Sequence, residues 1–367
     1  MPVNFGQLLT NMKKLEASDL HIKSGSPPIY RIHGNLRSVK DHPPVKKEEV
    51  VAIVNKILPE KLQGYLHDHG ACDFAFSIDA QTRFRTNAFY QKGSLSISLR
   101  RLQYEELDFN KLGLPDVLYE IAKYKRGMIL TTGPTGTGKS TTMATLIESV
   151  NTHRAEHIIT IEDPIEFVYK DKKSLIEQRE VGLDARNFEE ALRHALRQDP
   201  DVILIGEMRD RETIQIAIRA AMTGHLVIST LHTINAVHTV ERMVKYFRQE
   251  EQASMRSEIA TCLRAVISQR LIQNKDKNDR VPCVEVMICN DMVKKLIREN
   301  RIPDIEQIIR NGVDNMQSFD QSLAKLVNDQ KIALEVAEEY ADDVPSFRRM
   351  VKGVYAGTDK SGILGGF

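Results

Sequence analysis

The sequence predicts an α/β protein in which a small α+β domain precedes a larger domain built on a parallel β-sheet, with a helical part at its carboxyl end. Three runs within residues 72–102 alternate apolar and polar side chains, as antiparallel strands do. From residue 114 onwards, apolar strands alternate with amphipathic helices, the order typical of a parallel sheet covered by helices. A glycine-rich phosphate-binding motif lies between the first of these strands and its helix.

The predicted amino-terminal domain covers residues 1–103. Its apolar residues have helical spacing within 4–16 and 46–58. Strands are predicted on both sides of the turn at Pro27 and Pro28, at 18–23 and 30–38, and again at 72–78, 82–90 and 95–102. The domain contains no catalytic motif. The charged and turn-rich residues 104–113 are predicted to be a linker.

The second domain is predicted over residues 114–344. Its strands are expected at 127–132, 157–162, 202–206 and 226–231, and its helices at 141–150, 188–197 and 212–222. Residues 251–344 are predicted to be mainly helical, with one strand at 282–288, and the glycine-rich tail 345–367 is predicted to be flexible. Ligands of such sheets bind beyond the carboxyl ends of the strands, where we expect the polar motifs to lie.

The phosphate-binding loop matches the pattern G-x-x-x-x-G-K-[ST] in full. Its residues are Gly133, Pro134, Thr135, Gly136, Thr137, Gly138, Lys139, Ser140 and Thr141. The glycines let backbone N–H groups point at phosphate oxygens, Lys139 is expected to reach the β- and γ-phosphates, and Ser140 is expected to hold Mg²⁺. A chance glycine-rich turn is the alternative, but the strand before the loop and the helix after it favour a site for a nucleoside triphosphate.

Two acidic segments follow predicted strands. Glu207 ends the strand 202–206, where a carboxylate can polarise the attacking water or organise Mg²⁺. Glu162, Asp163 and Glu166 follow another strand and repel one another unless a cation lies among them, which beside a P-loop indicates Mg²⁺. The alternatives are an ordinary surface glutamate and a solvated acidic turn ended by Pro164.

Histidines and arginines supply the remaining candidates. His225 and His232 flank the strand 226–231, and one of them could contact the γ-phosphate, although a structural role is equally open. Arg85 and Arg100 of the first domain and Arg242 of the second are candidate arginine fingers that stabilise charge on the transferring phosphoryl group. Solvated arginines on an exposed sheet face are the simpler alternative for the first two.

The composition limits the kinds of partner and ligand that the chain is expected to bind. Lys and Arg number 51 and Asp and Glu number 50, so the net charge of +1 argues against a dedicated nucleic-acid-binding protein. The four cysteines form no C-x-x-C pair, so neither a zinc site nor a disulfide framework is expected. No apolar stretch approaches the roughly 18 residues of a membrane span. We therefore expect a cytoplasmic protein that reaches a membrane only through a partner.

These motifs, in this order, resemble the secretion ATPase superfamily that drives type II secretion and type IV pili. The P-loop and residues 161–166, 206–210 and 223–233 are similar to the Walker A, Asp, Walker B and His boxes of that family. Residues 18–21, 83–89 and 316–323 extend the resemblance over roughly residues 5–340. The chain looks like the pilus retraction branch, PilT and PilU, because the C-x-x-C zinc motif of extension and secretion members is absent.

The resemblance implies a PAS-like amino-terminal domain, a RecA-like ATPase domain, and a homo-hexamer that uses ATP and Mg²⁺. It implies work against a platform protein at the cytoplasmic face of the inner membrane. It also implies site roles: catalytic carboxylates at Glu207 and Glu166, a histidine pair at His225 and His232, and arginine fingers at Arg85 and Arg100.

One segment departs from the branch. Residues 292–297 read Met-Val-Lys-Lys-Leu-Ile where the retraction motor carries Ala-Ile-Arg-Asn-Leu-Ile, so an auxiliary motor that depends on a paralogue stays open. Two further alternatives are a RecA-type translocase acting on nucleic acid and a nucleotide-binding scaffold without activity. The net charge gives no support to the first, and Glu207 argues against the second.

Overall fold

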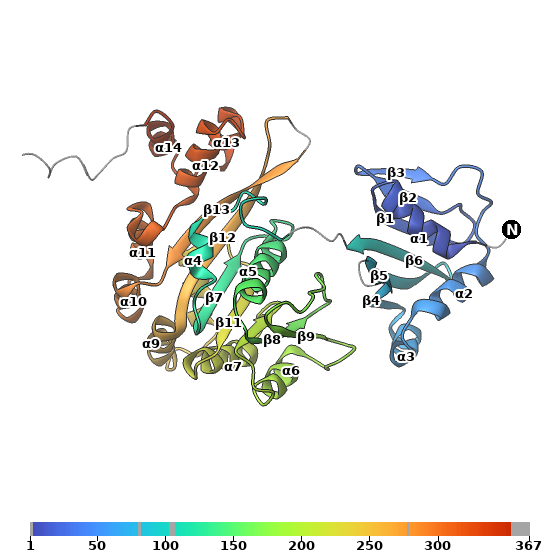
Figure 1. The fold of residues 1–367 in the computed structure, drawn as a ribbon, viewed down its shortest axis with the longest axis horizontal. Helices are drawn as coiled ribbons and strands as arrows, with labels where there is room; N and C mark the ends of the chain where they lie inside the picture. Colours follow the sequence, from blue (N-terminus) through green and yellow to red (C-terminus); the bar gives the residue numbers. More distant parts are fainter. Residues whose placement is uncertain (1–2, 80–81, 103–106, 277–278, 354–367) are drawn as a thin grey trace, which may run out of the picture. The chain divides into compact units, whose positions relative to one another are not determined.

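The computed structural model describes residues 3–79, 82–102, 107–276 and 279–353 (Figure 1). The chain forms two compact units, which are described separately. The amino-terminal unit comprises Met1–Glu105 together with Pro164–Val168, and the carboxyl-terminal unit comprises Glu106–Asp163 and Tyr169–Phe367. None of the described helices has both the length and the apolar character that a membrane span requires.

The amino-terminal unit contains an antiparallel sheet of six strands in the order β3-β2-β1-β6-β5-β4. Its strands are β1 (Ala17–Lys23), β2 (Ile29–Ile32), β3 (Asn35–Ser38), β4 (Ala71–Asp79), β5 (Thr82–Gln91) and β6 (Ser94–Leu102). Its helices are α1 (Phe5–Lys14), α2 (Lys47–Ile57) and α3 (Glu60–His69). Buried apolar residues of all three helices pack with alternate residues of the strands into one core, so the predicted α+β character is confirmed.

The single strand predicted at 30–38 is instead the hairpin of β2 and β3. His33 and Gly34 form its two-residue turn, with φ of 47° and 80°. Two consecutive positive φ values match the right-handed twist of the flanking strands, but histidine seldom takes the first of these positions. Of the two turn residues, only Gly34 is of a type that commonly adopts positive φ, so the sequence did not identify the turn. Helix α3 was not predicted at all.

The carboxyl-terminal unit is built on a sheet of seven strands in the order β13-β12-β7-β11-β10-β8-β9, in which β13 alone runs antiparallel to its neighbour among the described strands. The strands are β7 (Gly127–Thr132), β8 (His157–Glu162), β9 (Leu175–Glu180), β10 (Val202–Ile205), β11 (Leu226–Leu231), β12 (Leu263–Gln273) and β13 (Arg280–Ile288). The principal helices are α4 (Val117–Ile121), α5 (Lys139–His153), α6 (Phe188–Ala195), α7 (Arg211–Met222), α8 (Ala236–Lys245), α9 (Gln252–Cys262) and α10 (Asp291–Arg298).

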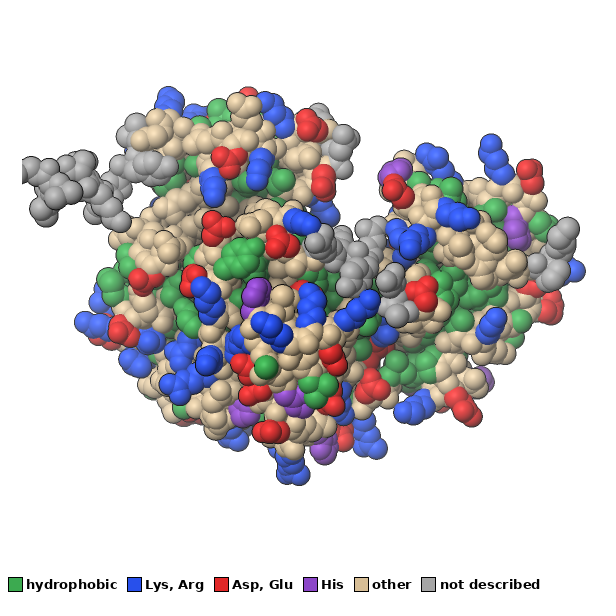
Figure 2. All heavy atoms as spheres, in the orientation of Figure 1, with side chains coloured by type: hydrophobic (Ala, Val, Ile, Leu, Met, Phe, Trp, Pro, Cys, Tyr) green, Lys and Arg blue, Asp and Glu red, His purple; other side chains and the backbone are tan. Residues whose placement is uncertain are grey.

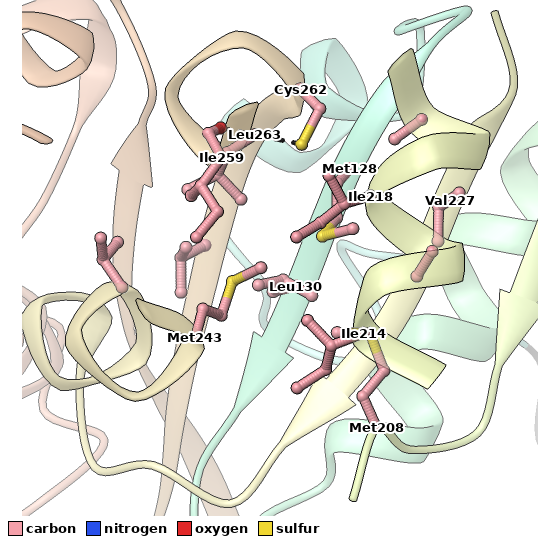
Figure 3. Packing of buried hydrophobic residues seen from close by; sticks show 14 of the residues in the cluster. Met128, Leu130, Met208, Ile214, Ile218, Val227, Met243, Ile259, Cys262 and Leu263 are labelled. Carbon is pink, nitrogen blue, oxygen red and sulfur yellow. Dashed lines mark hydrogen bonds between the residues drawn. The ribbon is translucent and has the colours of Figure 1, made fainter. Parts of the chain in front are cut away.

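Both faces of this sheet are buried. On one face Met128 and Leu130 of β7 pack with Ile214 and Ile218 of α7 and with residues of α8 and α9 (Figure 3). On the other face Ile129 joins apolar residues of α4 and α5. Burial on both sides explains the nearly continuous apolar strands, and it is typical of a parallel sheet covered by helices.

Beyond the sheet, the chain continues as short helices: α11 (Ile305–Arg310), α12 (Phe319–Asn328), α13 (Leu334–Tyr340) and α14 (Val344–Val351), with 3₁₀ turns at Ile302–Asp304 and Val313–Asn315. The flexible tail predicted from residue 345 is wrong for its first part, because α14 buries Phe347 completely against α12. Residues 354–367 of that tail lie outside the described residues.

Two further predictions need correction. Strands β9 and β12 were not predicted, and β12 lies within a region expected to be mainly helical. Its burial on both faces removes the alternation by which a strand is recognised, and α9 runs into it without an intervening loop. In the predicted linker 104–113, Phe109 is buried in the core of the carboxyl-terminal unit, while residues 104–106 lie outside the described part. The PAS-like character of the first domain stays a prediction.

Candidate active site

The phosphate-binding loop joins the carboxyl end of β7 to the amino end of α5, as the motif predicts. Gly133 and Gly138 have φ of 144° and 87°, which side-chain-bearing residues rarely adopt. A Cβ at Gly133 would lie 2.4 Å from the carbonyl oxygen of Gln269, and one at Gly138 would lie 2.8 Å from the side-chain amide of the same residue. Gly133 is therefore required by the close approach of the β12 backbone, and Gly138 by its positive φ.

Gln269 supports the loop directly. Its side-chain oxygen accepts a hydrogen bond of 2.7 Å from Thr142 Oγ1 on α5, and the residue is buried. Sequence reasoning missed Gln269 because it missed β12. The available signal was a glutamine in an otherwise largely apolar run.

Lys139 lies against the loop that carries it. Its Nζ donates hydrogen bonds of 2.8 Å to the carbonyl oxygens of Gly133 and Pro134. The ammonium charge and the amino end of the 15-residue helix α5 together create a positive site suited to an anion. Ser140 and Thr141 occupy the first turn of this helix and are half-buried, so their hydroxyls lie beside the same site.

Glu207 lies at the same sheet edge, immediately after β10. The backbone around it is fixed because Gly206 N donates to the carbonyl of Ile161 at 2.8 Å and Thr230 Oγ1 donates to the carbonyl of Gly206 at 2.7 Å. The ends of β7, β11 and β10 are in register, since Thr132 pairs with Leu231 and Ser229 with Ile205. The structure thus brings Glu207, His232 and the loop together at the carboxyl edge, as predicted.

Two side chains hold the carboxylate of Glu207. His232 Nε2 lies 3.4 Å from its Oε2, and Arg209 forms an ion pair with its Oε1. The hydrogen bond to Glu207 raises the pKa of the Arg209 guanidinium, and the nearby charge of Asp163 adds to the effect. Arg209 was not among the predicted site residues, although it lies two positions after Glu207.

Arg242 of α8 is exposed and lies close to His232. Its Nη1 is 3.5 Å from the carbonyl oxygen of His232, and its guanidinium lies over the ring of Tyr246, 5.8 Å from the centroid. Arg242 therefore contacts the His232 turn, which we define as residues 232–235, between β11 and α8.

His225 lies at the opposite end of β11. Its Nδ1 is 3.0 Å from the carbonyl oxygen of Ala220 and 3.3 Å from Thr223 Oγ1. Six residues at about 3.3 Å each separate the two ends of the strand, or roughly 20 Å. The expectation that all polar motifs gather at the carboxyl edge is wrong for His225.

The acidic segment after β8 is divided between the two units, with Glu162 and Asp163 in the carboxyl-terminal one. Glu162 is buried, and its Oε1 accepts hydrogen bonds from Thr160 Oγ1 at 2.7 Å and Gln178 Nε2 at 3.2 Å. Asp163 is exposed. Within the described ranges, no three Asp, Glu, His or Cys side chains come together as a metal site. The role of Glu162, Asp163 and Glu166 in holding Mg²⁺ stays a prediction.

Glu166, Arg85 and Arg100 belong to the amino-terminal unit. Arg85 Nη1 lies 3.9 Å from Glu166 Oε1, and both side chains are about two-fifths exposed, at 43% and 39%. Arg100 Nε lies 2.9 Å from Oδ1 of the buried Asp19. The structure does not bring these three residues together with Glu207 in one unit, and their predicted roles stay predictions.

Comparison with known proteins places this geometry in a family. A model of the family described as type II/IV secretion system protein matches residues 4–359. The chain belongs to this family. It is 45% identical over 267 residues to the type IV pilus retraction ATPase PilT of Pseudomonas aeruginosa, covering 73% of this chain and 77% of that protein. It is 35% identical over 351 residues to the type IV pilus ATPase PilU of the same organism, covering 95% and 92%.

Solved structures agree with this assignment. The structure of the pilus retraction motor PilT with bound ADP has a TM-score of 0.88 and 42% identity, and the match covers 95% of this chain and 100% of that one. The ATPase DotB of Legionella pneumophila has a TM-score of 0.81 and 28% identity, with 93% and 95% covered. The predicted superfamily, the two-domain α/β fold with a RecA-like domain and the class of enzyme, an ATPase, are confirmed.

Proposed function

We propose that this chain is an ATP-hydrolysing motor that powers retraction of a type IV pilus. The observation that carries the proposal is the position of Glu207, whose side chain is 14% exposed and is held by Arg209 and His232 at the strand edge that bears the phosphate-binding loop. A carboxylate at this place can orient water for in-line attack on a γ-phosphate. The relatives named as pilus retraction proteins supply the machine on which the hydrolysis acts.

In this mechanism the loop binds the phosphates through its backbone N–H groups and the amino end of α5. Lys139 exchanges the carbonyl oxygens of Gly133 and Pro134 for phosphate oxygens. Mg²⁺ fits beside Ser140, because a hydroxyl with phosphate and water oxygens is the ligand set that this ion prefers, and it would neutralise phosphate charge there. Thr141 adds a second hydroxyl in the same turn.

Glu207 accepts the proton of the attacking water or fixes its orientation. Arg209 and His232 hold the two carboxylate oxygens, so Glu207 keeps one position while the nucleotide binds. His232 is 48% exposed and can contact the γ-phosphate from the same edge. Arg242 keeps the backbone of His232 in place.

The motor is proposed to work as a homo-hexamer against a platform protein of the inner membrane, to which the chain binds peripherally from the cytoplasm. Arg85 and Arg100 are proposed as arginine fingers. Arg85 is the better candidate, because its ion pair with the partly exposed Glu166 is long, whereas Arg100 contacts the buried carboxylate of Asp19. Basic and acidic side chains are interspersed on the face of the carboxyl-terminal unit that Figure 2 shows, which supports a protein partner over nucleic acid.

An auxiliary motor that depends on a paralogue is the second candidate. The match to PilU extends over more of the chain than the match to PilT, although at lower identity. The departing residues 292–297 lie in α10, where Val293, Leu296 and Ile297 are buried and Met292 is exposed. Exchange of the outward residues thus alters the surface of α10 while its core contacts remain.

Complementation separates these candidates. The chain is expressed in P. aeruginosa that lacks PilT or lacks PilU, and twitching is scored, with Lys139→Ala as the matched inactive control. Restored twitching in the strain without PilT, lost again in the control, supports an autonomous retraction motor. Restoration only in the strain without PilU supports the auxiliary role. No restoration by a chain that is expressed and hydrolyses ATP would overturn the proposal.

A further inference from the structure

A buried chain of hydrogen bonds crosses the carboxyl-terminal unit beneath the candidate site. Thr132, the last residue of β7, donates from Oγ1 to Ser268 Oγ of β12 at 3.0 Å. Ser268 pairs with Glu285 of β13 across the two strands, and its hydroxyl acts against the effect of burial on that carboxylate. Glu285 Oε1 in turn accepts the backbone N–H of Ala236, the first residue of α8, at 2.8 Å. We call this series the Glu285 chain.

The position of Glu285 is unusual for a carboxylate. The residue is 6% exposed, and its neighbours along β13 are Cys283, Val284, Val286 and Met287, all buried. Burial of a carboxylate is costly unless polar partners compensate, and a glutamine or an apolar residue would avoid the cost. The partners that do compensate are Ala236 N and Ser268. The side chains of Arg270 and Asp342 act on Glu285 electrostatically with opposite signs.

The two ends of the Glu285 chain lie at the two halves of the candidate site. Thr132 directly precedes Gly133, the first residue of the phosphate-binding loop. Ala236 directly follows the His232 turn, whose histidine lies 3.4 Å from Glu207. Arg242, one and a half turns along α8, contacts the carbonyl of His232. A displacement of the amino end of α8 would therefore move His232 relative to both Glu207 and the loop.

We propose that Glu285 is a positioning residue for ATP hydrolysis, which fixes the His232 turn relative to the phosphate-binding loop. This inference rests on the proposed ATPase reaction. In its ionised form the Glu285 carboxylate accepts the backbone N–H of Ala236 and faces the hydroxyl of its strand partner Ser268, whose oxygen accepts from Thr132. The donors on both sides of Glu285 then point toward its carboxylate, from β7 on one side and from α8 on the other.

The test compares steady-state ATP hydrolysis by the full chain and by Glu285→Gln at a pH above the raised pKa of Glu285, about 7, where the wild-type side chain is ionised. The amide oxygen of glutamine still accepts from Ala236, but its N–H₂ must donate to Ser268 and so reverses the series toward Thr132. We expect kcat to fall roughly tenfold or more, with KM for ATP and affinity for ADP within about twofold, because positioning is lost and phosphate binding is kept.

Asp320→Asn is the matched control. Asp320 is also a buried carboxylate of this unit, and it accepts backbone N–H groups of Asp342 and Asp343 at 2.8 and 3.1 Å. Among the described residues, it forms no hydrogen bond with the loop or with α8. The kcat of Asp320→Asn is expected to stay at the wild-type value, even if its midpoint of thermal unfolding falls as much as that of Glu285→Gln. Equal losses of kcat in both variants would overturn the inference.

A second variant keeps the test decisive if Glu285→Gln does not fold. Ser268→Ala removes the link to Thr132 and leaves the contact between Glu285 and Ala236, so kcat should fall in the same direction by a smaller factor. Unchanged kcat in the folded variants, beside an active wild type, would refute the role of Glu285. A wild-type chain without ATPase activity would instead refute the proposed function itself.

Discussion

The carboxylate of Glu207 lies within reach of side chains from its own segment and from the neighbouring strand end. Arg209 follows it by two residues, and His232 comes from the end of β11. The carboxylate is mostly buried, so these partners fix its position more firmly than solvent could. A residue so held can orient water without first paying the entropy of finding its place.

Replacement of Glu207 by glutamine tests this role at the scale of one atom. Glu207→Gln keeps the size of the side chain but removes the proton acceptor, so kcat should fall by at least about a hundredfold. Affinity for ADP should stay within about threefold, since the loop is intact. The measurements are phosphate release and ADP titration. Glu306→Gln, an exposed glutamate that pairs with Arg310 on α11, is the control and should retain full activity. Hydrolysis by Glu207→Gln at the wild-type rate would exclude the proposed base.

At the scale of elements, β12 connects the loop to the rest of the sheet. It pairs with β7 on one side and β13 on the other, and Gln269 in its second half lies against Gly133, Gly138 and Thr142. The loop is therefore held from below by a neighbouring strand, in addition to the fold of its own glycines.

Removal of the Gln269 contact should weaken both stability and binding. Gln269→Ala leaves the buried hydroxyl of Thr142 without its acceptor, so we expect a loss of about 1–3 kcal/mol in the free energy of unfolding and weaker ADP binding. Thr142→Val removes the other partner of the same hydrogen bond and should change both quantities in the same direction. Denaturant unfolding and ADP titration measure them. An unaltered ADP affinity in both variants would show that β12 does not support the loop.

Sequence patterns predicted the elements whose ends are marked by glycines or by polar residues after a short apolar run. They missed elements that lack such marks. The loop has a fixed spacing of glycines, and Glu207 and His232 each end a short apolar run, so their meeting followed from parallel strand order. Gln269 lies inside β12, which was missed because burial on both faces hides the period of a strand, whereas the strand predicted at 282–288 is β13, which contains Glu285. Register across two such strands depends on packing partners far away in the sequence, which no local pattern encodes.

Helix α14 shows the opposite error: a flexible tail was predicted from residue 345, where the chain is still helical. Phe347 is fully buried among residues of α12, including Phe319 and Leu323. Phe347→Ala should therefore lower the free energy of unfolding by about 3–5 kcal/mol, whereas Phe347→Leu, which preserves most of the volume, should cost less than about 1.5 kcal/mol. Urea unfolding followed by circular dichroism gives both values. A loss below about 1 kcal/mol for the alanine variant would mean that α14 is not stably packed and that the predicted flexibility was correct.

At the scale of the molecule, each unit has its own hydrophobic core. A change in one core therefore acts first on the stability of its own unit. With 51 basic and 50 acidic side chains, the net charge is close to zero at neutral pH. Differences between variants in how stability depends on pH then report on single buried groups more than on the charge of the whole chain.

Glu285 is the buried group for which this dependence should be clearest. Burial raises its pKa from 4.5 to about 7, so the folded state holds a proton that the unfolded state releases at lower pH. Its contribution is present in full below pH 4.5 and is lost as the pH rises through about 7. Glu285→Gln has no such titration, so its stability relative to the wild type should rise between pH 5 and pH 8, by on the order of 3 kcal/mol at the limit. Urea unfolding of both proteins at each pH measures the difference, and Asp320→Asn repeats the comparison for a second buried carboxyl, whose pKa burial also raises. The difference in stability between Glu285→Gln and the wild type could instead stay constant across this range. The carboxylate would then be stabilised as well in the fold as in water, and its burial would carry no cost.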